Sequence, residues 1–156
     1  MNQLQASCRI SECKKNHALH YCNICENKNS DHLPRNCPHG IEVFHGTAVQ
    51  NIPSILENGL QPSTNGTLGR GIYFAKGIEA LQISVHRGDG SGFAVFKCKV
   101  NPKYCKTSVH PQWQGVTNSE FQEWCLQDCS KYAFVGLFLI QSIVKGVMVV
   151  GLMQML

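Results

Sequence analysis

The sequence predicts an α+β chain in which a strand-rich domain with few short helices (residues 41–156) follows a small Cys/His-rich, zinc-binding module (residues 1–40). Five of the nine cysteines and four of the seven histidines lie before Gly40, in a segment with few large apolar side chains. So thin a core rarely folds without a metal or a covalent staple. After Gly40, short apolar runs end at turn residues, which is typical of strands.

Composition limits the possible function classes. At 156 residues the chain has room for one ordinary domain and a small appended module. A hydrophobic content of 43% excludes global disorder. The net charge of +4 permits contact with nucleic acid or an anionic ligand without predicting either. The first residues, "MNQLQASCRISECKK", lack the apolar stretch of a signal peptide, so we expect a cytoplasmic or nuclear protein. In those compartments clustered Cys and His indicate metal more often than disulfides.

The spacing Cys22-x2-Cys25-x6-His32-x4-Cys37 predicts one tetrahedral zinc site, because a two-residue gap presents both sulfurs to one ion. The alternative is a set of buried free cysteines. The spacing resembles a zinc knuckle, a module that often binds single-stranded RNA, but has six residues before the histidine and no glycine there. Since the only aromatic residue of the module is Tyr21, RNA binding, protein binding and a purely structural role all stay open.

A second zinc site could form upstream of the first. Its spacing matches no defined motif, and a flexible basic lead-in is an equal alternative. The four residues that could supply it are Cys8, Cys13, His17 and His20.

Local signals predict the elements of the larger domain. We expect strands within residues 41–46, 71–75, 92–100 and 131–140. The clearest helix begins after Asn51 as N-cap, holds Pro53 in its first turn and closes at Gly59. This start leaves His45-Gly46-Thr47 as an exposed junction at a strand end. The last 23 residues predict a final pair of strands, with a membrane-bound or partner-binding tail as the alternative.

Three segments together resemble the ADP-ribosyltransferase domain of the poly(ADP-ribose) polymerase superfamily. They are "FHGT…NIPSILENGL" (44–60), "LGRGIYFAKGIEA" (68–80) and "EWCLQD" (123–128). The stretch "STNGTLGRGIY" (63–73) is most similar to the short virus-induced PARP-like proteins of fish. The resemblance implies a split antiparallel β-sheet core, NAD as substrate and a role in antiviral innate immunity.

The resemblance also implies roles for individual residues. His45 would bind the adenosine ribose, and the backbone of Gly46 would pair with the nicotinamide amide. Tyr73 would stack on the nicotinamide ring, with the glycines of "GRGIY" clearing space beside it. Glu123, favoured over Glu120, would orient the nicotinamide ribose and support the developing cation. The remaining residues expected at NAD are Thr47, Arg70 and Gly71.

One position departs from the family pattern. A serine that often contacts the nicotinamide amide is replaced by Leu81, unless Ser84 or Thr47 takes its place. The short stretch before Glu123 leaves little room for a polymer-accepting surface. We therefore expect mono-ADP-ribosylation of a protein or nucleic acid. The main alternative is an inactive PARP-like protein that binds viral RNA or a protein partner through its zinc module; an RNA 2′-phosphotransferase is a weaker one, because Arg70 alone supplies no basic pocket.

Overall fold

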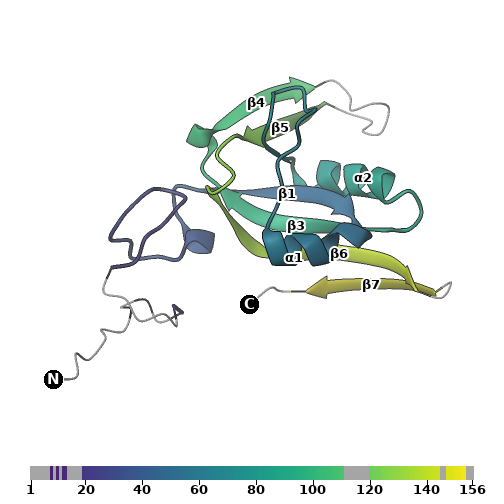
Figure 1. The fold of residues 1–156 in the computed structure, drawn as a ribbon, viewed down its shortest axis with the longest axis horizontal. Helices are drawn as coiled ribbons and strands as arrows, with labels where there is room; N and C mark the ends of the chain where they lie inside the picture. The colour runs from purple at the N-terminus through teal and green to yellow at the C-terminus, as the bar shows by residue number, and fades with distance from the viewer. Residues whose placement is uncertain are drawn as a thin grey trace.

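The structure is a computed structural model, and it describes residues 8, 10, 12, 13, 19–110, 120–144 and 147–153. Two antiparallel sheets form its framework (Figure 1). The larger sheet has the order β1-β3-β6-β7 and the smaller one the order β2-β5-β4. The strands are β1 (Ile41–Ala48), β2 (Ile72–Phe74), β3 (Gly92–Val100), β4 (Cys105–His110), β5 (Phe121–Leu126), β6 (Tyr132–Val144) and β7 (Val147–Met153).

The two sheets meet at β1, which is the edge strand of the larger sheet and lies beside β2 of the smaller sheet. A bridge between Phe44 and Ala75 joins them there, with backbone hydrogen bonds of 2.8 and 2.9 Å. The core lies between the sheets and contains Val43, Phe74, Phe96 and Trp124, all buried. Burying each such side chain contributes roughly 1.5–3 kcal/mol. The predicted α+β class with a split antiparallel core is therefore confirmed.

The helices are short. They are α1 (Ile52–Asn58), α2 (Gly77–Gly88) and the 3-10 turns η1 (Pro34–Asn36), η2 (Val49–Asn51) and η3 (Pro102–Tyr104). The predicted helix is confirmed as α1, with Pro53 in its first turn and Gly59 at φ 76° after its end. Asn51 precedes it but makes no side-chain cap; its amide instead donates to Oγ1 of Thr47 at 2.9 Å.

The predicted junction at His45 was wrong, because β1 continues to Ala48. Antiparallel pairing with β3 carries on through His45↔Phe96 and Gly46↔Val95 to Ala48↔Phe93. Hydrogen bonding to β3 therefore extends β1 beyond Phe44, the last bulky apolar residue of the strand. His45 lies within the sheet, and its position is fixed by hydrogen bonds on the β3 side.

The final segment pairs as predicted. β6 and β7 are antiparallel, with Val144↔Val147 nearest the turn. Within the described part of the chain, no helix has the length and apolar character that a membrane crossing needs.

The Cys/His-rich segment docks on the start of β6. The Asn23 amide donates to the carbonyl oxygens of Ser130 at 2.7 Å and Tyr132 at 3.0 Å. Ile24 is fully buried, and its carbonyl accepts a hydrogen bond from the Asn101 side chain at 3.2 Å. These contacts attach the segment to the sheet domain at several points.

Candidate active site

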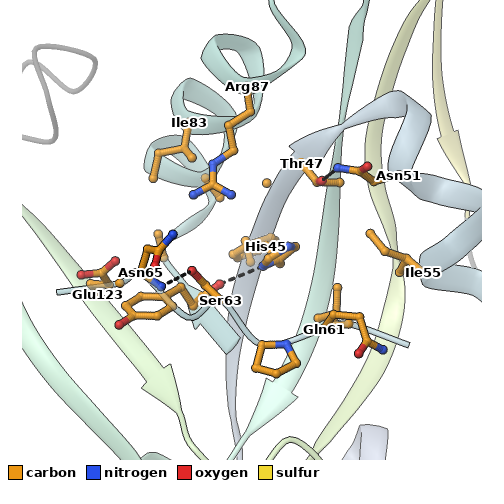
Figure 2. A pocket seen from close by; sticks show the side chains of 18 of the residues that line it. His45, Thr47, Asn51, Ile55, Gln61, Ser63, Asn65, Ile83, Arg87 and Glu123 are labelled. Atoms are coloured by element: carbon orange, nitrogen blue, oxygen red, sulfur yellow. Dashed lines mark hydrogen bonds between the residues drawn. The ribbon is translucent and has the colours of Figure 1, made fainter. Parts of the chain in front are cut away.

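An open pocket of about 660 Å³ lies beside β1, at the junction of the two sheets. Figure 2 shows Arg87 and Ile83 on one side, Ile55 on another, and His45 between them. Strand β5 contributes Glu123 and strand β4 contributes His110 to the same pocket. Four expected NAD-site residues, His45, Gly46, Thr47 and Tyr73, also line it.

His45 is oriented by a neighbouring strand. Its Nδ1 lies 2.8 Å from the carbonyl oxygen of Tyr73, and a carbonyl only accepts, so Nδ1 carries the hydrogen. Burial lowers the pKa of His45, and the charge of Arg87 lowers it further, against the effect of the Tyr73 hydrogen bond. The ring is thus neutral at pH 7, and Nε2 keeps an acceptor lone pair. Such a group can accept a hydrogen bond from a sugar hydroxyl.

Tyr73 is held by the loop that precedes β2. Its hydroxyl accepts from the Leu68 amide at 2.9 Å and donates to the Gly69 carbonyl at 2.6 Å. Burial raises its pKa to about 12, so the phenol is neutral at pH 7. A Cβ on Gly66 would lie 1.9 Å from Cζ of Tyr73. A glycine at 66 is therefore needed for the loop to pack against this ring.

Glu123 pairs with a histidine that the sequence did not single out. Its Oε2 lies 2.8 Å from Nε2 of His110, and the Thr67 hydroxyl donates to the same oxygen at 3.4 Å. Both side chains are mostly buried, with 14% of Glu123 and 23% of His110 exposed. The β4–β5 register, Ser108↔Glu123 and His110↔Phe121, makes them diagonal neighbours on one face.

Two expected NAD-site residues lie outside the pocket lining. Arg70 is exposed, and Gly71 is buried against β5, where a Cβ would lie 2.5 Å from Sγ of Cys125. Gly71 thus permits close strand packing. Gly46 does line the pocket, but a Cβ there would lie 2.2 Å from the Ala80 carbonyl oxygen. Close approach of α2 explains this glycine without reference to a ligand.

Thr47 and Ser84, the two residues that could replace the serine absent at position 81, differ in whether they reach the pocket. Thr47 lines the pocket, and its Oγ1 accepts a hydrogen bond from Asn51. Ser84 is fully buried in α2, where its hydroxyl donates to the Leu81 carbonyl at 2.7 Å, and neither Ser84 nor Leu81 is among the residues lining the pocket. The carboxylate of Glu123, and not that of Glu120, lines the pocket.

The four predicted zinc ligands come together. The ligand atoms of Cys22, Cys25, His32 and Cys37 lie within 4.8 Å of one another. Sγ of Cys25 and Nε2 of His32 are 3.6 Å apart. Two ligands of one tetrahedral zinc ion, with ordinary Zn–S and Zn–N bonds, have their sulfur and nitrogen atoms about 3.6 Å apart. Nδ1 of His32 lies 2.8 Å from the Asp31 carboxylate, which orients Nε2 toward the cluster. The donor set fits zinc.

Three of the four residues expected at the second site also converge. The ligand atoms of Cys8, Cys13 and His20 lie within 4.8 Å of one another, and Sγ of Cys8 is 3.6 Å from Nδ1 of His20. The fourth, His17, lies outside the described residues. The three groups present could hold a metal ion.

Comparison with known proteins identifies the family. The model of the poly(ADP-ribose) polymerase catalytic domain matches residues 8–108. This range covers most of the chain and includes β1 and β2, which carry His45 and Tyr73. No curated protein and no solved structure matches the chain significantly. By the match of its family model, the chain belongs to the poly(ADP-ribose) polymerase catalytic-domain family.

Proposed function

We propose that the protein is an NAD-dependent mono-ADP-ribosyltransferase, which transfers ADP-ribose to a protein or nucleic acid and releases nicotinamide. The observation that carries the proposal is the convergence of His45, Tyr73 and Glu123 on one pocket, from three strands of two sheets. The family, which acts on NAD, supports the same reaction class.

Each residue has a role that its surroundings suit. The free Nε2 of His45 would accept a hydrogen bond from the adenosine ribose, and the Gly46 backbone would pair with the nicotinamide amide. The neutral ring of Tyr73, fixed by its hydroxyl, would stack on the nicotinamide ring. Thr47 would contribute a polar contact, whereas Arg70 and Gly71 would act outside the pocket lining.

Glu123 would carry the chemistry. Departure of nicotinamide breaks the bond between its ring nitrogen and C1′ of the ribose and leaves an oxocarbenium-like sugar. A carboxylate that is fixed before the reaction and partly shielded from water stabilises such a cation strongly. Glu123 meets both conditions, since its side chain is only 14% exposed and is held by two hydrogen bonds.

The short chain segment before β5 supports transfer of a single ADP-ribose. Strand β4 ends at His110 and β5 begins at Phe121, so ten residues connect the two strands. So short a connection leaves little surface on which a growing polymer could bind as acceptor. Mono-transfer is therefore the proposed outcome.

The zinc module would stabilise the domain. Zinc held by Cys22, Cys25, His32 and Cys37 would supply the folding energy that so small a core lacks. A second ion would bind at Cys8, Cys13 and His20, with His17 as the expected fourth ligand. Single-stranded RNA is a further partner that a zinc-knuckle-like module could bind.

A second candidate is a non-catalytic protein that binds viral RNA or a protein partner. Leu81, which stands where the family often has a serine contact to nicotinamide, favours it. Release of nicotinamide from NAD separates the two candidates. We expect release by the zinc-loaded wild type and by Glu120→Gln, and a loss of at least about 10²-fold in Glu123→Gln. No release and no NAD binding by the wild type would favour the second candidate.

A further inference from the structure

His110 lies beside Glu123 in the pocket. It lies at the end of β4, lines the pocket and stacks on Phe121 with ring centroids 5.1 Å apart and an interplanar angle of 29°. The stacking and the 2.8 Å contact to Glu123 fix the imidazole at two points. These two contacts hold the imidazole in one orientation.

The two carboxylate oxygens of Glu123 have different surroundings. Oε2 receives the hydrogen bonds of both His110 and Thr67. Within the described ranges, no hydrogen bond to Oε1 is found. Oε1 can therefore bind a ribose hydroxyl of NAD while Oε2 stays with His110. The pairing with His110 does not compete with the proposed role of Glu123.

The same pairing determines which nitrogen of His110 can act as a base. A carboxylate oxygen only accepts, so Nε2 of His110 carries the hydrogen, and in the neutral ring the lone pair lies on Nδ1. A carboxylate that orients a histidine base, which in turn activates a hydroxyl, is a recurrent catalytic arrangement. We propose that His110 is the general base of the transfer and that the acceptor is a hydroxyl side chain of a protein. This inference rests on the proposed function.

The step balances without any further reactant. The acceptor oxygen forms a bond to C1′ of the nicotinamide ribose as the bond from C1′ to the nicotinamide nitrogen breaks. The electron pair of the broken bond neutralises the pyridinium, so nicotinamide leaves uncharged. The hydroxyl proton passes to Nδ1 of His110, and the imidazolium is stabilised by Glu123 until it returns the proton to water.

The presence of a base points to the class of acceptor. Carboxylates and phosphates are already anionic at neutral pH and need no base, whereas a serine or threonine hydroxyl does. The surroundings of His110 favour a protein over a nucleic acid as the acceptor. Of the described residues that line the pocket, only Arg87 is a lysine or arginine, and Val109, next to His110, is 57% exposed. Binding of a phosphate backbone would call for more cations.

The test uses the full zinc-loaded chain, NAD and two synthetic peptides that differ at one central residue, Ser or Glu, together with a 5′-phosphorylated oligonucleotide. Two products are measured: ADP-ribose on the acceptor, and free ADP-ribose from hydrolysis of NAD. The variants are His110→Gln, whose amide can still donate to Glu123, and His110→Ala. His86→Ala, which changes a histidine outside the pocket lining, is the matched control.

We expect the wild type to modify the Ser peptide in preference to the other two acceptors. His110→Gln should lower that transfer by about 10²-fold or more while it retains NAD hydrolysis, and added imidazole should partly restore transfer by His110→Ala. The inference would be overturned if His110→Gln transferred ADP-ribose as fast as the wild type, or if it lost transfer and NAD hydrolysis equally. It would also be overturned if the wild type preferred the Glu peptide or the oligonucleotide. Absence of both products in the wild type would instead overturn the proposed function.

Discussion

The Nδ1–H of His45 donates a hydrogen bond to the carbonyl oxygen of Tyr73 at 2.8 Å, across the junction between the two sheets. One contact thus fixes the tautomer of the histidine and ties it to the strand that carries the tyrosine. Because β1 and β2 belong to different sheets, the pocket depends on how these sheets meet.

Replacement of His45 should weaken NAD binding. We expect His45→Ala to bind NAD about tenfold more weakly, because one hydrogen bond to a ribose hydroxyl is lost. Calorimetric titration with NAD measures this, with His86→Ala as the control. An unchanged affinity in His45→Ala would remove His45 from the ligand site.

The stability of the fold should depend on the protonation of His45. Burial lowers its pKa below the ordinary value of 6.5, so the unfolded chain takes up this proton first as the pH falls. The free energy of unfolding should therefore be insensitive to this group above about pH 7.5 and fall below about pH 6.5. The slope for one such proton is at most about 1.4 kcal/mol per pH unit. Denaturation of the wild type and of His45→Gln between pH 8 and 5 should show a smaller loss in the variant; identical curves would contradict the assignment.

The packing of Gly66 against Tyr73 predicts a selective defect. Gly66→Ala would place a methyl group within 1.9 Å of Cζ of Tyr73 and displace the ring. We expect NAD binding to be lost. Gly90→Ala is the control, because nothing lies within 4 Å of the Cβ that it adds, although the φ of 78° at Gly90 makes the substitution itself strained. If both variants bind NAD equally well, the ring of Tyr73 is not needed in its present position.

Removal of zinc should destabilise the whole chain. Cys37→Ser should lower the zinc content by one ion and lower the melting temperature, and a chelator should lower the melting temperature of the wild type. Cys129→Ser, at a half-buried thiol outside both clusters, should change neither. Elemental analysis and thermal denaturation measure the two effects. A Cys37→Ser chain that keeps the zinc content of the wild type would contradict the ligand set.

The docking of the zinc module can be tested at Asn23. Among the described residues, Asn23→Ala would remove two side-chain hydrogen bonds, those to the carbonyl oxygens of Ser130 and Tyr132. We expect a loss of about 1–3 kcal/mol in the free energy of unfolding. Asn36→Ala, at an exposed position of the same module, should cost less than about 0.5 kcal/mol. Equal losses in chemical denaturation would show that the module is not attached through Asn23.

Local signals predicted part of this structure well. Pro53 and Gly59 mark the two ends of α1, because the fixed φ of proline suits a first helical turn and the positive φ of Gly59 ends the helix, whereas Asn51 makes no side-chain cap. Motifs also led to His45, Tyr73 and Glu123, which do share one pocket. Residues expected at an NAD site are recognisable because the proposed chemistry constrains their type.

Long-range contacts account for what was missed. The length of β1 depends on pairing with β3, about 50 residues away, and Gly46 is required by the approach of α2. Neither of these long-range contacts can be predicted from the residues next to it in the sequence. His110 reaches Glu123 only through the register of β4 on β5, and β4 itself was not predicted. The sequence of β4, CKTSVH, shows no regular alternation of apolar and polar residues, so no local signal indicated this strand.

Transfer of labelled ADP-ribose from NAD tests the central claim most directly. The zinc-loaded wild type is incubated with adenine-labelled NAD and an acceptor, beside Glu123→Gln and Glu120→Gln. We predict single ADP-ribose units on the acceptor with the wild type and Glu120→Gln, and at least about 10²-fold less with Glu123→Gln. Equal labelling by all three proteins would contradict the assignment of Glu123 and, with it, the proposed active site.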